Sequence, residues 1–252
     1  TLAHEEGKHH NSENLDSLIS KEKDYFILNG QKNFVLDGSI SDNFIVSAND
    51  ESGLKTLLVI VDANSDGIKI MHKVHMDSRT YSEITFSNVK IEKDNFLSMN
   101  GDGDTILKKT FDITRIGLAS EMLGSIQQAF EITMAYLKER EQFGVKIGSF
   151  QALQHRSALM FGEIELCKSI VLKALQSIDS NDPNLSKYAS LAKAKLGMVF
   201  KLVTNEAVQM HGGIGVTDDA DIGFFLKRAR VIQRILGDSN YHLDRLAKIN
   251  SY

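Results

Sequence analysis

Residues 209–217 read Gln-Met-His-Gly-Gly-Ile-Gly-Val-Thr and place three glycines within four positions. The run follows a long stretch of helix-forming residues, so it predicts the point at which a helix ends, with Gly212 and Gly213 at the C-cap. Glycine adopts positive φ at helix C-termini and exposes bare backbone to a neighbouring group. Two interpretations follow. The stretch is a turn between two helices, or its backbone amides and Gln209 face a flat or phosphorylated ligand.

The composition is typical of a soluble globular protein. The 252 residues are 42% hydrophobic and 25% charged, with a formal net charge of −4. These values predict one large domain or two ordinary ones and give no reason to expect a nucleic acid or a membrane as partner. A single cysteine, Cys167, indicates a reducing compartment, so we expect a cytoplasmic protein. Because the chain begins at Thr1, we expect it to be a piece of a longer protein.

The first part of the chain predicts a β domain over residues 1–100. Polar turns separate seven short β-like segments, which are Tyr25–Leu28, Lys32–Leu36, Asn43–Ser47, Thr56–Val61, Gly67–Met71, Tyr81–Phe86 and Val89–Ile91. This pattern is typical of an antiparallel sandwich or barrel, and Asn29-Gly30 predicts a hairpin turn between the first two segments. The preceding residues 1–22, with the polar run Glu5–Asn11, are expected to form a surface loop with a solvated His9-His10 pair.

After residue 100 the apolar period changes to that of helices. The predicted helices are Ile106–Arg140, Phe150–Ile178, Leu185–Met210, Asp221–Arg234 and Ser239–Ile249. Their short connections predict an up-down bundle of four to five helices over residues 101–252. The fold class is therefore α+β, a β domain followed by a helical bundle. Because the glycine run follows a helix rather than a strand, it does not match a Rossmann fingerprint.

Three polar clusters interrupt the predicted helices. They are Phe111-Asp-Ile-Thr-Arg115, Arg140-Glu-Gln-Phe-Gly144 and Phe150-Gln-Ala-Leu-Gln-His155. Each admits two interpretations when it is taken alone. Arg140 favours the negative end of the helix dipole or contacts a ligand, and Gln151 is a surface side chain or a ligand contact. The order and spacing of the whole set favour a ligand.

In that order, and followed by Gln-x-His-Gly-Gly-x-Gly, the clusters resemble the C-terminal helical domain of the flavin-dependent acyl-CoA dehydrogenases. The β domain agrees, because residues 29–35, Asn-Gly-Gln-Lys-Asn-Phe-Val, are similar to a strand of the family's middle β domain. Residues 77–79 and 83–89 resemble the end of that domain. The resemblance covers nearly the whole chain, and it implies that an N-terminal helical domain precedes it in the full protein.

The resemblance implies an FAD held at a subunit boundary. The residues that it implies for the cofactor are Phe34, Val35, Leu36, Arg140, Gln142, Phe143, Phe150, Gln151, Gln209, Gly212 and Gly213. Arg140 would pair with the pyrophosphate, since a guanidinium matches phosphate oxygens. Phe34 would stack beside the isoalloxazine. Leu36 stands where a threonine is usual, so a hydroxyl contact is lost. Asp112 and Arg115 match positions that touch the acyl-CoA, and no metal is implied.

The implied reaction removes the α-proton of an acyl-CoA while hydride passes from the β-carbon to flavin N5, and it needs a carboxylate base. The base position holds Leu236 in Leu236-Gly-Asp-Ser239, and the alternative position used by some members holds Thr114. Asp238 is the nearest acid, and it is either a substitute base or the N-cap of the last helix. The first loop also departs from the family, with His4-Glu-Glu-Gly-Lys-His-His10 where a Gly- and Ser-rich motif is common.

Three functions remain open. The chain belongs to an FAD-dependent acyl-CoA dehydrogenase of fatty acid metabolism, with an electron-transferring flavoprotein or similar acceptor, in which it is active or is a subunit lacking its own glutamate. Alternatively it is a noncatalytic flavin- or partner-binding scaffold, or the structural subunit of a hetero-oligomeric dehydrogenase. A third interpretation is a domain fragment that holds both ligands partly. A homo- or hetero-oligomer, dimer or tetramer, is expected in the first case.

Overall fold

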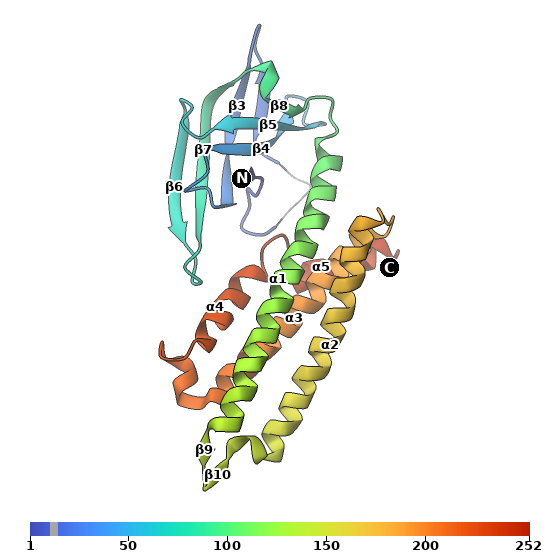
Figure 1. Cartoon of the computed structure of the whole chain (residues 1–252). Coiled ribbons are helices and arrows are strands. Elements are labelled where there is room, and N and C mark those ends of the chain that lie inside the picture. Colours follow the sequence, from blue (N-terminus) through green and yellow to red (C-terminus); the bar gives the residue numbers. More distant parts are fainter. Residues whose placement is uncertain (11–14) are drawn as a thin grey trace. The chain divides into compact units, whose positions relative to one another are not determined.

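The computed structural model describes residues 1–10 and 15–252. It comprises two compact units, residues 1–110 and 111–252, and each unit has its own hydrophobic core. The first unit is built from strands and the second from helices (Figure 1). The α+β prediction is confirmed.

The strands of residues 1–110 form one eight-stranded sheet. Its order is β6-β7-β3-β2-β4-β5-β8, with β1 beside β4. Neighbouring strands are antiparallel, except that β1 and β2 run parallel to β4. The strands are β1 (Leu2–Ala3), β2 (Leu18–Lys21), β3 (Phe26–Leu36), β4 (Asn43–Asp50), β5 (Thr56–Asp62), β6 (Ile68–Val74), β7 (Thr80–Ile91) and β8 (Phe96–Ser98), the last following a 3-10 turn at Lys93–Asn95.

The hairpin predicted at Asn29-Gly30 is wrong, because β3 runs through both residues without turning. A register shift against β7 lies between Leu28 and Gly30, and the Asn29 side-chain oxygen accepts from the Asn88 backbone N–H at 2.8 Å there. A Cβ at Gly30 would lie 2.1 Å from Ser17 Oγ and 2.7 Å from Ser17 Cα. The glycine therefore marks a bulge and a close backbone approach rather than a turn.

The interpretation of residues 1–22 as a surface loop is wrong for two segments, because β1 and β2 belong to the sheet. The alternation of apolar residues in these strands is too short to be seen in the sequence. Lys32 of β3 is completely buried and pairs with Glu6. This ion pair attaches the segment between β1 and β2 to the sheet. His9 is exposed, whereas His10 bonds to Glu5. The predicted polar run also includes Asn11, which lies outside the described residues.

The helical unit follows the sequence closely. Its elements are α1 (Gly103–Glu139, which begins in the first unit), β9 (Glu141–Gln142), β10 (Val145–Lys146), a 3-10 turn at Ile147–Ser149, α2 (Gln151–Asp179), α3 (Leu185–His211), a 3-10 turn at Gly212–Val216, α4 (Ile222–Ile232) and α5 (Ser239–Ile249). The largest error in a predicted helix end is three residues, at the start of α1. The sequence did not predict the small β9–β10 hairpin.

The chain reverses direction between α1, α2 and α3, so these helices form an up-down arrangement (Figure 1). α3 packs against α2, α4 and α5, and its core-facing side is rich in small residues, namely Ala189, Ala192, Ala194, Gly197 and Ala207. Small side chains let neighbouring helices approach closely. Larger apolar residues of α1 and α2 complete the same core, among them Ile116, Met122, Met160 and Val171.

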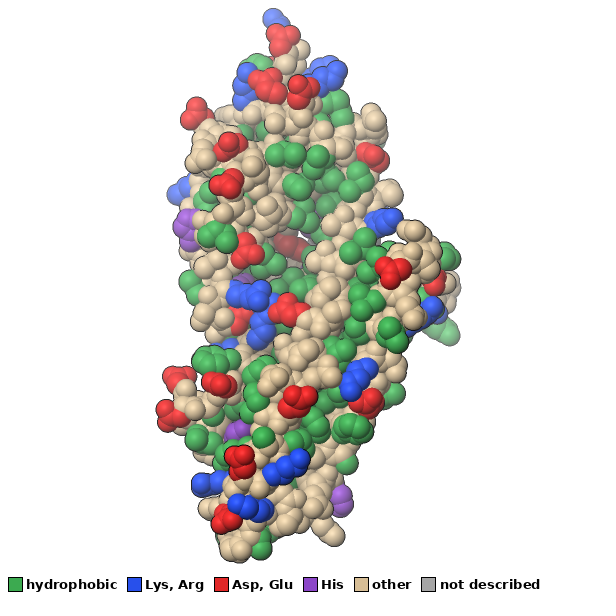
Figure 2. Space-filling model, in the orientation of Figure 1, with side chains coloured by type: hydrophobic (Ala, Val, Ile, Leu, Met, Phe, Trp, Pro, Cys, Tyr) green, Lys and Arg blue, Asp and Glu red, His purple; other side chains and the backbone are tan. Residues whose placement is uncertain are grey.

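On the face that Figure 2 shows, acidic and basic side chains of the helical unit are interspersed rather than gathered by sign. Within residues 1–10 and 15–252, no helix combines the length and the apolarity that crossing a bilayer requires.

Candidate functional site

One end of the helical unit gathers the glycine run and the β9–β10 hairpin. The Tyr136 ring of α1 stacks on His211 of α3 with 4.4 Å between centroids, and its hydroxyl donates to the His211 carbonyl at 3.2 Å. α1 and α3 therefore end side by side. The hairpin turns at Phe143 and Gly144, whose φ values are 55° and 78°. The glycine run caps α3 as predicted, with Gly212 at φ 67°.

Eight of the predicted cofactor residues are exposed at this end, and we call them the hairpin set: Arg140, Gln142, Phe143, Phe150, Gln151, Gln209, Gly212 and Gly213. Phe143 is 91% exposed and its ring meets Phe150 edge to face at 6.2 Å. Among the described residues, the Arg140 guanidinium has no hydrogen-bond or ion-pair partner. A Cβ at Gly212 or Gly213 would meet no atom within 4 Å. Exposed aromatic rings, an unpaired guanidinium and bare backbone fit a flat ligand that carries phosphate.

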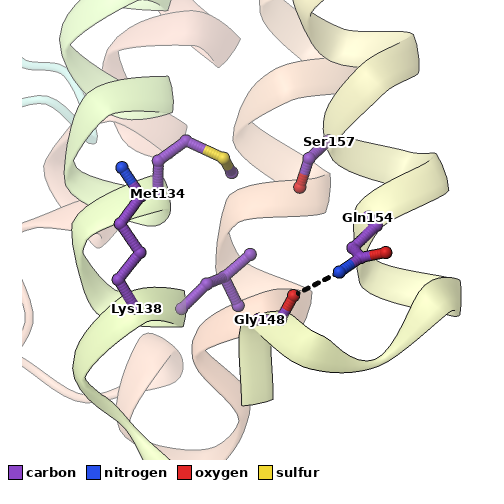
Figure 3. Close-up of a pocket in the computed structure, with 6 residues that line it drawn as sticks. Met134, Lys138, Gly148, Gln154 and Ser157 are labelled. Carbon is purple, nitrogen blue, oxygen red and sulfur yellow. Dashed lines mark hydrogen bonds between the residues drawn. The ribbon is translucent and has the colours of Figure 1, made fainter. Parts of the chain in front are cut away.

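A pocket of about 250 Å³ lies beside the hairpin set, between α1 and the start of α2. Its lining residues are Met134, Leu137, Lys138, Gly148, Gln154 and Ser157 (Figure 3). Gln154 donates to the Gly148 carbonyl at 3.0 Å across one side of it. The pocket adds apolar surface next to the exposed aromatic rings, and it contains neither Asp112 nor Arg115.

The remaining predicted cofactor residues lie on β3 in the first unit. Phe34 has φ 55° and is 46% exposed. Its ring stacks on Tyr81 at 4.8 Å and on His75 at 5.6 Å, so an aromatic platform is already assembled there. Val35 is buried in the sheet core, and Leu36 is half-buried. Of the three side chains, only that of Phe34 is exposed enough to contact a ligand.

Asp112 and Arg115 form the centre of a buried charge network in the helical unit. Both side chains are 2% exposed. Asp112 accepts from Arg115 Nη1 at 2.9 Å and from Arg245 Nη2 at 3.1 Å, and it also accepts from the Ser186 hydroxyl. Burial and the nearby Arg245 charge lower the pKa of Arg115. The two predicted substrate residues are therefore committed to protein partners.

The charge network contacts the predicted base position at its backbone carbonyl. Leu236 has φ 55°, and its carbonyl accepts from Arg115 Nε at 3.2 Å and from His242 Nε2 at 3.0 Å. Gly237 follows at φ 100°, where a Cβ would lie 2.3 Å from the Tyr241 ring. Left-handed backbone at a non-glycine residue persists only where its surroundings enforce it, and it is concentrated at functional sites.

No carboxylate stands at the predicted base positions. Position 236 carries leucine, and position 114 carries an exposed threonine. The Asp238 carboxylate accepts from the Tyr241 backbone N–H at 2.9 Å as the N-cap of α5. The capping alternative therefore accounts for Asp238. Among the described residues, no group of three His, Cys, Asp or Glu side chains could hold a metal ion.

Sequence reasoning missed the other members of the network, which are Ser186, Ser190, Lys193, His242 and Arg245. One signal was available. Lys193 lies between Ala192 and Ala194 on the apolar side of its helix, where a charged residue needs a specific partner. Nothing in the sequence indicates that Asp112 meets Arg245, because 133 residues separate them.

His242 is completely buried, and burial together with the charges of Arg115 and Lys193 lowers its pKa to about 2. The ring is therefore neutral. Because the Leu236 carbonyl can only accept, Nε2 carries the proton and donates to it. Nδ1 then accepts from the Ser190 hydroxyl at 3.3 Å. The tautomer follows from these partners.

We expect His242 to make the protein acid-sensitive and a His242→Gln variant to reduce that sensitivity. Between the unfolded pKa near 6.5 and the folded pKa of about 2, only the unfolded chain binds the proton. The free energy of unfolding therefore falls as pH falls below 6.5, by up to about 1.4 kcal/mol per pH unit from this residue. Glutamine keeps an N–H for the Leu236 carbonyl without titrating. Urea unfolding of both proteins at about pH 7, 6 and 5 measures the difference, and equal pH slopes would contradict it.

Comparison with known proteins agrees with the division into a sheet unit and a helical unit. The model of the acyl-CoA dehydrogenase C-terminal domain matches residues 101–250, and that of the middle domain matches residues 2–89. The chain is 30% identical over 240 residues to the mitochondrial short/branched chain specific acyl-CoA dehydrogenase of Bos taurus, a match that covers 93% of this chain and 55% of that protein. It is 35% identical over 225 residues to the 3-(aryl)acrylate reductase of Clostridium sporogenes, covering 87% and 59%.

Among solved structures, the butyryl-CoA dehydrogenase from Megasphaera elsdenii matches with a TM-score of 0.92 at 26% identity, covering 100% of this chain and 68% of that chain. A sheet unit followed by an up-down helical bundle is thus a fold that this chain shares with an acyl-CoA dehydrogenase of known structure. The chain belongs to the acyl-CoA dehydrogenase family, whose members are FAD flavoproteins. It spans little more than half the length of these curated relatives.

Proposed function

We propose that the chain is the middle and C-terminal part of an FAD-dependent acyl-CoA dehydrogenase that lacks its own catalytic glutamate. The observation that carries this proposal is the turn at Leu236. Its backbone is left-handed and is held by Arg115 and His242, yet its side chain cannot accept a proton. In this proposal a partner chain supplies the carboxylate.

The hairpin set and Phe34 are proposed to bind FAD, which when bound accepts hydride at N5. Arg140 pairs with pyrophosphate oxygens, because its guanidinium is exposed and unpaired among the described residues. Gly212 and Gly213 leave open space for a diphosphate to approach the backbone. Phe34 stacks beside the isoalloxazine, with Val35 and Leu36 placing its strand. Gln142, Phe143, Phe150, Gln151 and Gln209 complete the surface of the hairpin set.

Asp112 and Arg115 are proposed to act on the acyl-CoA site indirectly, by holding the protein around it, because their side chains are buried. Their charges are paired inside the helical unit, and Arg115 acts on the site by holding the Leu236 carbonyl. Arg115 and Arg140 are separated by about 37 Å along α1. This separation supports a cofactor shared between two copies, because two distant parts of one helix then serve different sites. A dimer or tetramer, homo- or hetero-oligomeric, is therefore part of the proposal.

The proposed partners are an acyl-CoA and an electron-transferring flavoprotein or similar acceptor, in fatty acid metabolism. The proposed location is the cytoplasm. Cys167 is buried with its pKa raised to about 12 by burial, and an inert single thiol is consistent with a reducing compartment. We also propose that residues 1–100 and 101–252 correspond to the middle and C-terminal domains, as the spans of the two matching family models support.

A noncatalytic scaffold is the alternative, and the commitment of Asp238 to the α5 cap favours it. Neither position 114, a threonine, nor position 236, a leucine, carries an acid. In that case the protein binds flavin or a partner chain without turnover.

The test uses the full-length protein, alone and with any neighbouring paralogue. We expect bound FAD in both preparations, and bleaching of the flavin by anaerobic acyl-CoA only in the paired one. Bleaching by the lone chain would contradict the missing base. A mixed preparation that holds FAD but never bleaches would support the scaffold.

A variant tests the flavin assignment separately. Arg140→Ala should weaken FAD binding about tenfold or more, because it removes a charge-assisted hydrogen bond to phosphate. Lys168→Ala is the matched control, since Lys168 is an exposed cation of α2 that pairs with Glu165 far from the hairpin set. The flavin content after gel filtration and the Kd from fluorescence measure both. Equal affinity in the two variants would remove Arg140 from the site.

A further inference from the structure

We propose that Lys193 is a positioning residue, which fixes the turn of residues 232–237 and thereby the orientation of residue 236 towards the acyl-CoA. The inference rests on the proposed function, because only there does residue 236 face the substrate. It adds a role for a residue that no sequence motif assigns.

Lys193 Nζ donates to three backbone carbonyls of this turn. The distances are 3.3 Å to Ile232, 3.0 Å to Gln233 and 2.9 Å to Gly237. A protonated ammonium has three N–H donors, so every donor is used on one segment. The side chain is 1% exposed. Among the described residues, no carboxylate lies within ion-pair distance of it.

These carbonyls are a suitable partner for a buried cation. Ile232 is the last residue of α4, and the C-terminal end of a helix carries partial negative charge that favours cations. Burying an ammonium is nonetheless unfavourable. An apolar side chain would pack among the neighbouring alanines of α3, so core packing alone gives no reason for a lysine here.

The turn needs this support because its own backbone bonds are long. Ile235 N–H to the Ile232 carbonyl and Gly237 N–H to the Arg234 carbonyl are both 3.3 Å. The segment must hold Leu236 at φ 55° and Gly237 at φ 100°. Of the side-chain hydrogen bonds to the carbonyls of the turn, the one from Lys193 to Gly237 is the shortest. Lys193 also joins both ends of the turn to α3. Without it, residue 236 is held only by bonds to its own carbonyl.

The surroundings of Lys193 make its role dependent on pH. The charged or titratable groups around it are Arg115 from α1, Asp238 at the N-cap of α5 and His242 from α5, and the Arg245 charge also acts on His242. Burial and the Arg115 charge lower the pKa of Lys193 to about 7. The neutral amine has only two N–H donors, so one carbonyl is released as pH rises through this value.

Amide hydrogen exchange of the full-length protein tests the anchoring without using activity. In the unaltered protein, we expect protection factors of residues 235–241 to fall as pH rises from about 6 to 8. Lys193→Met should lower them about tenfold or more at the lower pH and remove the pH dependence. Lys195→Met is the matched control, because Lys195 lies on the same helix and bonds to Glu163 instead. Should Lys193→Met not fold, Lys193→Gln keeps two donors and shows a smaller loss.

Two results would overturn the anchoring. One is unchanged protection and pH dependence in both Lys193 variants. The other is an equal loss in residues 160–178 of α2, which would show a general structural role.

Turnover tests the positioning step. In a Leu236→Glu background, adding Lys193→Met should lower kcat about tenfold or more with KM for the acyl-CoA nearly unchanged, because only the reacting group is displaced. An undiminished kcat would overturn the proposal. If Leu236→Glu alone is inactive although FAD is bound, the proposed function fails while the exchange result still decides whether Lys193 anchors the turn.

Discussion

Replacing Leu236 by glutamate should give the protein a gain in acyl-CoA-dependent flavin reduction over the unaltered chain. The turn already holds residue 236 by its carbonyl through Arg115 and His242, so the new side chain starts from a fixed backbone. A positioned general base contributes about 10²- to 10⁴-fold in rate. Anaerobic stopped-flow measurement of flavin bleaching by acyl-CoAs of several lengths gives the gain.

Two variants separate proton transfer from a change of shape. Leu236→Gln has the length of glutamate without its basicity, and it should give no gain. Thr114→Glu offers the carboxylate from the other position that family members use, and it tests whether α1 also faces the substrate. If Leu236→Glu retains FAD and shows no bleaching with any acyl-CoA, the pocket around position 236 has diverged and the restored base has no substrate to act on.

The helices were predictable because their signals are local. Each helix buries an apolar stripe that repeats every three or four residues, and Ser239–Ile249 was predicted with both ends correct because Asp238 is a strong cap. The strands were less predictable. β3 and β7 are single long strands, and bulges divide each of them into two apparent segments in the sequence. The sequence alone does not distinguish a glycine at a bulge from a glycine in a turn.

The site was predictable only where a motif is contiguous. The Arg140 cluster and the glycine run lie at one end of the bundle, as their common assignment requires, because Tyr136 and His211 join the two helix ends. The support of Leu236 could not be predicted. It depends on pairs such as Arg115 with Leu236, 121 residues apart, and only the packing of α1 against α3 and α5 brings these groups together.

Removing the Asp112 carboxylate should be among the most destabilising single changes in the helical unit. Asp112→Ala removes the carboxylate that pairs with both Arg115 and Arg245, and Arg115 is 2% exposed. Breaking a buried pair by removing one partner costs about 3–5 kcal/mol, since the remaining charge stays buried. Urea unfolding followed by far-ultraviolet circular dichroism, which reports the helices, measures the loss.

The controls decide whether charge or packing is responsible. Asp112→Asn keeps the size of the side chain and should still lose much of the stability, whereas Glu165→Ala, which breaks the exposed Lys168–Glu165 pair, should change little. Adding Arg245→Met to Asp112→Ala should recover part of the loss, because one unpaired guanidinium is then removed. A small effect of Asp112→Ala would mean that solvent or the Ser186 and Ser190 hydroxyls satisfy both arginines. In that case the role of the charge network would be to hold the Leu236 turn, and not to stabilise the helical unit.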